Sequence, residues 1–261
     1  MKSALTRTIF GSVLALALAG CTSESQIKSA IEKNPDILFN AIEKNPEKFM
    51  EVVQRASMAA QRKQQEDMEK EEQKRVENEL KNPLTPEWSA DRATEGNKAG
   101  QIKIVEYSDF QCPYCGKGYQ VLQQVLKAYP GKVHFMFKNL PLPMHPMAMP
   151  AAKRFEAIAL QDAGKAYKFH NEVFENQQKL GSGGEKYLDS VAAKVGADVA
   201  RMKKDMDGDK VKGRIEADMK EAEKYGISGT PGFVVNGVSV RGAYPFETFK
   251  GIIDKKLAEN K

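Results

Sequence analysis

The segment 101–129 constrains the fold of this chain most, because it predicts a strand that leads through two cysteines into a helix. Residues 101–110 ("QIKIVEYSDF") are typical of a buried strand, and residues 113–129 place apolar side chains at helical spacing. Cys112 and Cys115 therefore lie one turn apart at the start of the helix, where unpaired amides and the helix dipole favour a thiolate. Pro113 suits that turn, since its nitrogen carries no proton that could be left unpaired.

Three kinds of chemistry are open to two cysteines at this spacing. A zinc site would need two more cysteines or histidines at matching spacing, and His134, His145 and His170 do not supply them. A purely structural disulfide across two residues is rare. We therefore interpret Cys112 as an exposed nucleophile of low pKa and Cys115 as a shielded resolving thiol. Such a pair needs no dissociable cofactor and no metal.

The rest of the C-terminal region has the pattern of a mixed sheet with added helices. In chain order, a strand, a block of helices, a hairpin and a closing helix are predicted for residues 133–142, about 146–226, 232–244 and 245–260. The hairpin turns at Asn236-Gly237, a dipeptide typical of two-residue hairpin loops. Together with the first strand and helix, this order predicts an α/β, thioredoxin-like catalytic domain over residues 100–260 with a helical insertion.

A second motif, Gly229-Thr230-Pro231-Gly232, lies directly before the hairpin. In thioredoxin-like folds a cis-proline at this place faces the cysteine pair, and the residue before it offers backbone hydrogen bonds to a substrate. Most X–Pro bonds are trans, so a plain turn stays open as an alternative. The joint presence of both motifs predicts that Thr230 and Pro231 bind substrate together with Pro113 and Tyr114.

The N-terminus has the pattern of a bacterial export signal. Two basic residues precede an apolar run that is too short to span a bilayer. Leu18-Ala19-Gly20-Cys21 resembles a lipobox, so we expect residues 1–20 to be removed and Cys21 to be lipidated; ordinary cleavage after Ala19 is the alternative. Thr22 stands where a retention signal has Asp, which favours an outer-membrane anchor. Either route leads to the periplasm, an oxidising compartment.

Residues 22–80 predict an all-α extension. "AIEKNPD" at 30–36 recurs as "AIEKNPE" at 41–47, and in each copy Asn can cap a helix that begins with Pro. Two short helices and a long one from about Pro46 to Leu80 follow from this pattern. No other predicted element buries the apolar side chains of this extension. This favours a helical arm that joins two or more copies of the chain, most simply a dimer. A solvated stalk is the alternative, and residues 81–99 are predicted to be a linker.

The charge of the chain argues against one class of partner. The formal net charge is +5, and loss of the two basic residues of the signal leaves about +3, a mild excess spread along the sequence. This balance gives no reason to expect a nucleic acid or an acidic substrate.

With these motifs, the chain resembles the DsbA family of bacterial thiol:disulfide oxidoreductases over roughly residues 100–260. The resemblance rests on "VEYSDFQCPYC", on "GTPGFVVNG" and on the helical insertion between them. DsbA itself has Pro-His between its cysteines, and its imidazole helps to stabilise the thiolate, so the strength of DsbA as an oxidant is not implied for Tyr114. The lipobox and the extension resemble the lipoprotein and oligomeric branches, in which isomerase activity accompanies or replaces oxidation.

Glu106 matches the buried acid that the family has near its active site. We expect it to take up the proton that Cys115 must lose, with Lys138 on the next strand as its partner. A solvated pair at the edge of the sheet is the alternative.

Residues 141–150 ("PLPMHPMAMP") gather Met144, His145, Met147 and Met149. Thioethers and imidazole suit Cu(I). Methionines in such a loop more often pack at the rim of a site or contact an unfolded substrate adaptably.

These patterns predict thiol–disulfide exchange on unfolded or misfolded secreted proteins, as an isomerase, as an oxidase recharged by a membrane redox partner, or as both. The alternative from another class is a non-catalytic surface lipoprotein that binds copper or a protein partner.

Overall fold

The computed structural model describes residues 24–259, so the predicted signal peptide and Cys21 lie outside the described residues. These residues form two units, which divide between Glu69 and Lys70. Within residues 24–259, no helix combines the length and the hydropathy needed to cross a membrane.

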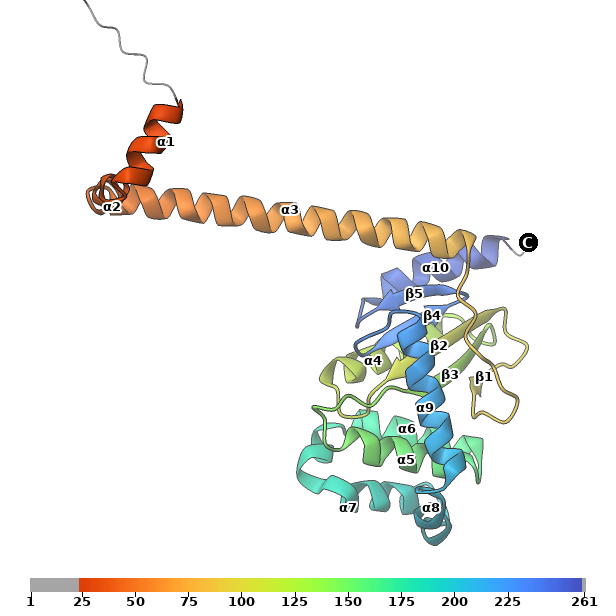
Figure 1. Ribbon diagram of the computed structural model, residues 1–261. Coiled ribbons are helices and arrows are strands. Elements are labelled where there is room, and N and C mark those ends of the chain that lie inside the picture. The colour runs from red at the N-terminus through yellow and green to blue at the C-terminus, as the bar shows by residue number, and fades with distance from the viewer. Residues whose placement is uncertain (1–23, 260–261) are drawn as a thin grey trace, which may run out of the picture. The chain divides into compact units, whose positions relative to one another are not determined.

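The first unit contains the two short helices and the long helix that the repeated motif predicts. They are α1 (Glu24–Lys33), α2 (Asp36–Glu43) and the first part of α3 (Pro46–Lys81) (Figure 1). The predicted cap by an Asn side chain is absent at α2. The Asn45 amide instead donates to the Ala41 carbonyl at 3.0 Å, at the other end of α2.

Most apolar side chains of this unit are exposed in the described part of the chain, while Ile31 and Ile42 are partly buried. Neither α1 nor α2 contains a buried residue, and the buried residue of α3 is Glu79, which belongs to the second unit. The exposed large apolar residues are Ile27, Ile37, Leu38, Phe39, Phe49, Met50, Val52, Val53, Met58 and Met68. We call this set the apolar arm surface.

The second unit is built on a five-stranded sheet in the order β1-β3-β2-β4-β5. The strands are β1 (Glu95–Gly96), β2 (Ile102–Ser108), β3 (Val133–Asn139), β4 (Gly232–Val235) and β5 (Val238–Arg241). β2 and β3 are parallel because α4 (Pro113–Ala128) crosses over between them, whereas the other pairs are antiparallel. Positive φ angles at Asn236 and Gly237 form the predicted hairpin turn.

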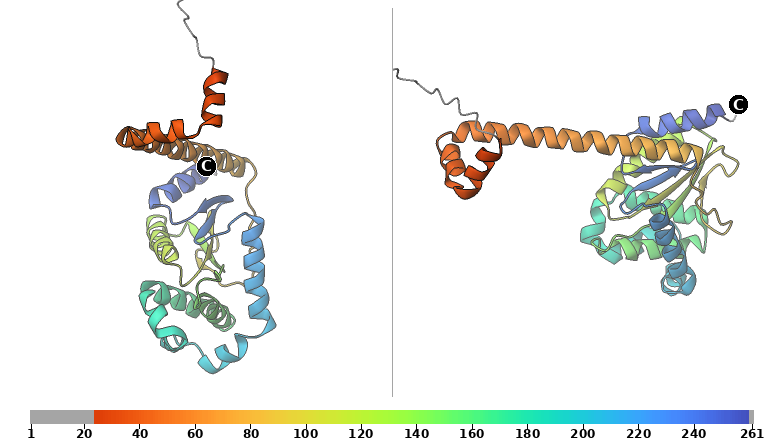
Figure 2. Two further views of the ribbon diagram at one scale, coloured as in Figure 1. Left: turned by 60° about the vertical axis from the view of Figure 1, so that its left-hand side comes forward. Right: turned by 45° about the horizontal axis from the view of Figure 1, so that its top comes forward.

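Helices cover both faces of this sheet. In the left view of Figure 2 the sheet lies between α4 and α9 (Asp209–Lys224), and α10 (Phe246–Glu259) packs against α4. Side chains alternate along β2, so Ile102 and Ile104 belong to the core that contains α4, while Val105 and Tyr107 belong to the core that contains α9. Glu106 therefore shares the α4 face with Ile104.

The helical insertion lies within the predicted range. It comprises α5 (Ala148–Ala159), α6 (Ala163–Glu175), α7 (Gln178–Lys194), α8 (Val199–Asp205) and α9. Asp162 and Asp198 cap α6 and α8 by accepting the amides of Lys165 and Arg201. Gly184 has a φ of 54° and kinks α7.

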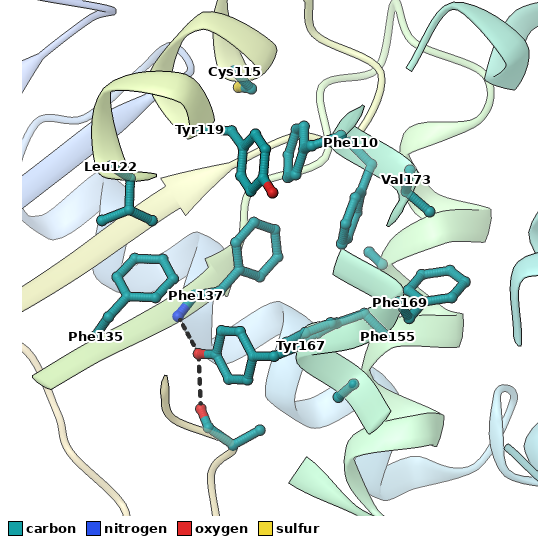
Figure 3. Packing of buried hydrophobic residues seen from close by; sticks show 14 of the residues in the cluster. Phe110, Cys115, Tyr119, Leu122, Phe135, Phe137, Phe155, Tyr167, Phe169 and Val173 are labelled. Carbon is teal, nitrogen blue, oxygen red and sulfur yellow. Dashed lines mark hydrogen bonds between the residues drawn. The ribbon is translucent and has the colours of Figure 1, made fainter. Parts of the chain in front are cut away.

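An aromatic cluster joins the insertion to the sheet (Figure 3). The Phe110 ring, just after β2, lies 4.9 Å from Phe137 of β3 and 5.1 Å from Phe174 of α6. The Tyr167 hydroxyl accepts the Phe137 amide and donates to the Ala93 carbonyl. The residues that flank the cysteine pair are therefore held by a packed core.

The last turns of α3 and the segment after it are attached to the second unit. Glu79 is buried and accepts the Ser239 amide at 2.7 Å and Arg75 Nη1 at 2.7 Å. The Leu84 amide donates to the Gly237 carbonyl at 2.9 Å. The division between the units thus falls before Lys70, whereas we predicted that the arm extends to Leu80.

Candidate active site

The cysteine pair begins α4, as the sequence predicts. Cys112 is the N-cap residue with an extended backbone (φ −70°, ψ 122°), and Pro113 follows at the first helical position. The Cys112 amide donates to the Asp109 carbonyl at 3.1 Å, and the Cys115 amide donates to the Cys112 carbonyl at 3.0 Å. Both cysteines are free thiols in this structure.

The surroundings of Cys112 favour its thiolate. The Cys115 side chain, the Thr230 side chain and the amides of Tyr114 and Cys115 together lower the pKa of Cys112 to about 5, against the opposing effect of burial. Our expectation of an exposed nucleophile is wrong, since only 4% of Cys112 is accessible. The Thr230 carbonyl lies 3.5 Å from Sγ and helps to cover it.

Cys115 has the opposite character. It is fully buried, and the Asp109 amide donates to its sulfur at 3.4 Å. Burial first, then the hydrogen bond with Cys112 and the negative charge of Glu106, raise the pKa of the Cys115 thiol well above its usual value. Cys115 therefore stays protonated until a base removes its proton.

Glu106, the acid predicted to take up this proton, is the carboxyl group whose charge acts on Cys115. It is fully buried, and among the described residues neither of its carboxyl oxygens has a hydrogen-bond partner. Burial raises the pKa of Glu106 to about 8, although the nearby Ser108 hydroxyl lowers it in part. This carboxyl group can both accept and release a proton near neutral pH.

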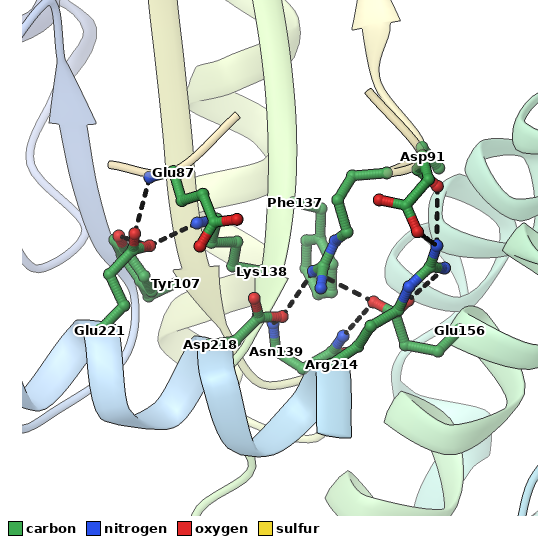
Figure 4. Close-up of polar contacts among 12 residues, drawn as sticks. Glu87, Asp91, Tyr107, Phe137, Lys138, Asn139, Glu156, Arg214, Asp218 and Glu221 are labelled. Atoms are coloured by element: carbon green, nitrogen blue, oxygen red, sulfur yellow. Dashed lines mark hydrogen bonds and ion pairs between the residues drawn. The ribbon is translucent and has the colours of Figure 1, made fainter. Parts of the chain in front are cut away.

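The predicted partnership of Glu106 with Lys138 is wrong. In the sheet Glu106 lies opposite Phe137, and Lys138 lies opposite Tyr107, so Lys138 points to the other face. There its ammonium group forms an ion pair with Glu221 of α9 (Figure 4).

Asp109 is a residue of the site that sequence reasoning missed. It is buried, and its carboxylate accepts the Gln111 amide at 2.7 Å, the Leu142 amide at 2.9 Å and His145 Nδ1 at 2.7 Å. Asp at the end of a strand, two residues before an amide that it can cap, was a signal for the first of these contacts. Asp109 thereby ties the loop after β3 to the cysteine turn.

That loop brings methionines to the rim of the site. The Met147 amide donates to Gln111 Oε1 at 2.6 Å, and Met144 is 72% exposed. Tyr114, between the two cysteines, is 59% exposed. His145 directs Nδ1 to Asp109, and residues 24–259 contain no group of three or more His, Cys, Asp or Glu side chains arranged to hold a metal ion.

Gln177, between α6 and α7, is the second residue that sequence reasoning missed. Its side-chain amide donates to the carbonyls of Phe110 and Cys112 at 2.9 and 2.8 Å. No local sequence pattern marks it, because its partners lie 67 and 65 residues earlier in the chain.

The two motifs of the sequence meet at the site. The Thr230–Pro231 peptide bond is cis, and Pro231 is buried beneath α4. A Cβ atom at Gly118 of α4 would lie 3.1 Å from Pro231 Cγ, so the helix approaches the proline closely. The Cys112 sulfur lies 3.5 Å from the Thr230 carbonyl, and the Tyr114 side chain, two residues along the chain, is exposed.

Residues 89–255 match the family model described as thioredoxin. The chain belongs to the thioredoxin family. In this chain Cys112 and Cys115 lie at the start of a helix, Pro231 follows a cis peptide bond, and Glu106 is buried, as predicted above.

Solved structures resemble this thioredoxin-family chain closely in fold. A thioredoxin-like oxidoreductase from Silicibacter pomeroyi is 26% identical with a TM-score of 0.57, over 66% of this chain and 95% of that one. The thiol-disulfide exchange protein α-DsbA2 from Wolbachia pipientis is 19% identical (TM-score 0.57; 64% and 88% covered). Proteus mirabilis ScsC is 20% identical (TM-score 0.56; 91% and 97% covered). The predicted likeness to DsbA-family proteins is thus confirmed for the fold.

Curated relatives of similar sequence are Na⁺/H⁺ antiporters. NhaA 3 from Salinispora tropica is 31% identical over 164 residues, which is 62% of this chain and 24% of the antiporter. The chain thus spans about a quarter of the length of the curated relatives it matches.

Proposed function

We propose that this protein catalyses thiol–disulfide exchange on secreted polypeptides through Cys112 and Cys115. The observation that carries the proposal is the opposite character of the two thiols: the pKa of Cys112 is lowered to about 5, whereas the pKa of the buried Cys115 is raised. A ready nucleophile beside a protected resolving thiol is the requirement for exchange through a mixed disulfide.

In the reducing direction, the Cys112 thiolate attacks one sulfur of a substrate disulfide. A bond forms between Cys112 and that sulfur, the substrate S–S bond breaks, and the second substrate sulfur leaves as a thiolate with the bonding electrons. This thiolate can attack elsewhere in the substrate and rearrange its disulfides, which is isomerisation. A substrate thiolate finally attacks the substrate sulfur that is bonded to Cys112, a new substrate disulfide forms, and Cys112 leaves as the thiolate that began the cycle.

Resolution by Cys115 completes a net oxidation of the enzyme. Glu106 accepts the Cys115 proton, and the new thiolate attacks the Cys112 sulfur and releases the substrate sulfur as a thiolate. The enzyme now holds the Cys112–Cys115 disulfide, and the substrate has gained two electrons. The oxidase direction is the reverse. A substrate thiolate attacks Cys112, Cys115 leaves as a thiolate, and Glu106 returns the proton to it. A second substrate thiolate then attacks the substrate sulfur bonded to Cys112, forms the substrate disulfide and releases the Cys112 thiolate.

The substrate we propose is an unfolded or misfolded secreted polypeptide. Tyr114, Met144 and Met149 are exposed apolar side chains near the site, and such side chains adapt to many sequences. The polypeptide backbone would bind beside Thr230.

Two cysteine variants test the exchange function on a scrambled disulfide protein. Cys112→Ser removes the nucleophile, so reshuffling should fall to the uncatalysed rate. Cys115→Ser keeps the nucleophile and should accumulate a mixed disulfide with the substrate. If Cys112→Ser reshuffles as fast as the unmodified protein, the function fails and a non-catalytic binding lipoprotein becomes the better hypothesis.

The direction of exchange depends on a redox partner. We propose that a membrane redox partner returns the pair to its working state after each cycle. Trapping of free thiols in periplasmic extracts measures that state: a mostly oxidised Cys112–Cys115 pair indicates an oxidase, and a mostly reduced pair indicates an isomerase.

We propose further that the apolar arm surface, within residues 22–80, joins copies of the chain into a homo-oligomer, most simply a dimer. Exposed apolar patches of this kind mark interaction sites in soluble proteins. Ten large apolar side chains of helices α1 to α3 are exposed in the described chain, which supports a second copy as the partner.

Substitutions in the full chain test the arm. Phe39→Glu with Val53→Glu should shift the mass measured by light scattering to that of a monomer. Gln54→Glu is the matched control, since Gln54 neighbours Val53 but is polar and exposed. An unchanged mass in the double variant contradicts the proposal.

We also propose that the mature chain is lipid-anchored in the periplasm, with the outer membrane favoured. The support is the lipobox-like sequence that ends at Cys21. Cys21→Ala should release the protein into the soluble periplasmic fraction; the same membrane fraction for both proteins contradicts the anchor.

A further inference from the structure

Gln177 connects the helical insertion to the turn that carries Cys112. Its Nε2 group donates one hydrogen to the Phe110 carbonyl at 2.9 Å and the other to the Cys112 carbonyl at 2.8 Å. An amide nitrogen has two donors, so both are used here. The two carbonyls lie on either side of Gln111, in the turn between β2 and α4.

The Cys112 carbonyl is also the first acceptor of α4. It accepts the amides of Cys115 at 3.0 Å and Gly116 at 3.3 Å. The orientation of this carbonyl therefore depends on the orientation of the first amides of the helix. Among these, the amides of Tyr114 and Cys115 face the Cys112 sulfur. A donor that holds the carbonyl from outside the helix also holds these amides in place.

Gly116 fits against Gln177. A Cβ atom at position 116 would lie 2.6 Å from Gln177 Oε1, so any side chain there would have to displace the Gln177 amide. The glutamine amide thus lies directly over the first turn of α4, held between Gly116 on one side and the two carbonyls on the other.

We propose that Gln177 is a positioning residue for the Cys112 thiolate: its amide, supplied by the helical insertion, fixes the peptide groups around Gln111 and keeps the α4 amides directed at the Cys112 sulfur. The inference rests on the proposed exchange function and adds a role for the insertion in it. The N–H groups of the Gln177 amide also point at the two carbonyl oxygens. They offset the partial negative charge of these oxygens, which would otherwise disfavour the nearby Cys112 thiolate.

Spectroscopic titration of the Cys112 thiolate in the full-length protein tests this role. Thiolates absorb in the ultraviolet more strongly than thiols, so absorbance against pH reports the midpoint. Gln177→Leu keeps the size of the side chain but removes both donors, and its midpoint should rise by about one pH unit. Gln177→Glu places a carboxylate against the same carbonyls and should raise the midpoint further. The titratable groups that face Cys112 are Cys115 and, behind it, Glu106, and neither is altered.

Gln178→Leu is the matched control. Gln178 is the next residue, is exposed and has no hydrogen bond to the turn among the described contacts. Its variant should titrate like the unmodified protein. Gly116→Ala should act like Gln177→Leu, because the added methyl group displaces the amide. In a Gln177→Ala background, Gly116→Ala should add little further shift of the midpoint.

A change in the titration midpoint separates positioning from support of the fold. If Gln177→Leu lowers only the unfolding midpoint and titrates like Gln178→Leu, the inference is overturned. If the unmodified protein shows the low midpoint but does not reshuffle a scrambled protein, the exchange function fails, while a shift caused by Gln177→Leu still supports the positioning role.

Discussion

Glu106 and Asp109 are two buried carboxyl groups at the end of the same strand, and they differ in their hydrogen bonds. Asp109 accepts three N–H donors, from Gln111, Leu142 and His145. Among the described residues Glu106 accepts none, and burial raises its pKa to about 8. Both groups lie next to Cys115, since Asp109 donates its amide to the Cys115 sulfur and the charge of Glu106 raises the pKa of that thiol.

The difference separates a structural carboxylate from a reactive one. A buried charge that is fully hydrogen-bonded stabilises the arrangement around it, whereas a buried acid without partners is destabilising when it ionises. Buried acids whose pKa values are shifted in this way are found mainly at sites where a proton is transferred. Neutralising each residue should therefore have opposite effects on stability.

Glu106→Leu should give the largest effect, and it should be stabilising. The pKa of Glu106 is raised from 4.5 to about 8. The contribution of this carboxyl group to the free energy of unfolding is therefore fully present below pH 4.5 and is lost as the pH rises through 8. The variant should exceed the unmodified protein by about 3 kcal/mol at about pH 7 and by about 5 kcal/mol at about pH 9. Denaturant unfolding at a series of pH values measures this gain.

The same variant should resolve mixed disulfides about tenfold to a hundredfold more slowly, because Cys115 loses its base. The pKa of Cys112 is lowered, whereas that of Glu106 is raised, so both groups make the stability depend on pH. Both proteins contain Cys112, so subtracting their free energies of unfolding at each pH leaves the contribution of Glu106. Glu106→Gln is the control of similar shape, and its difference from the unmodified protein should grow with pH in the same way. A stability difference that stays constant across this pH range contradicts the raised pKa.

Asp109→Ala should be destabilising by about 3 kcal/mol, because two backbone amides and one imidazole lose their acceptor. Asp109→Asn should fall between Ala and the unmodified protein, since it keeps one acceptor oxygen. Urea unfolding near neutral pH measures both. A loss below about 1 kcal/mol for the Ala variant would show that water replaces the carboxylate without penalty, and the contrast with Glu106 would disappear.

The sequence predicts the parts of this site that depend on local pattern and chain order. Cys112 and Cys115 follow from a strand that leads into a helix, and their meeting with Pro231 follows from the resemblance to a known fold. The error at Lys138 has a physical cause. A side chain changes face with each residue along a strand, so its partner depends on the pairing register with β2, which the sequence of β3 alone does not contain.

The contacts of Gln177 and the His145 contact of Asp109 were beyond the same reasoning. Gln177 reaches its acceptors from the connection between two inserted helices, and its position depends on how α6 and α7 pack. The Gln111 contact of Asp109 is local and carries a turn signal, but His145 joins from a loop 36 residues later. Long-range hydrogen bonds of this kind leave no periodic trace in the sequence.

His170 extends the comparison to a buried base. It lies in the aromatic cluster, 4.7 Å from the Phe137 ring, and its Nε2 has no partner among the described residues. Burial lowers its pKa from 6.5 to about 4, so its contribution to stability is present above pH 6.5 and is lost as the pH falls towards 4. In the unmodified protein, protonation of His170 should lower the free energy of unfolding by about 2 kcal/mol as the pH falls from about 7 to about 5. His170→Phe should remove this loss. Thermal or urea unfolding of both proteins over this range would show parallel profiles if the prediction is wrong.

His145 gives the smallest effect and the most direct test of Asp109. His145→Leu removes one of three donors at a partly exposed position, so we expect a loss of about 1 kcal/mol. His145→Asn keeps a donor near the place of Nδ1 and should recover most of that loss. In an Asp109→Ala background, His145→Leu should have almost no effect, because its partner is already absent. An equal loss in both backgrounds would mean that His145 stabilises the methionine loop through packing, and that Asp109 differs from Glu106 by its two backbone donors alone.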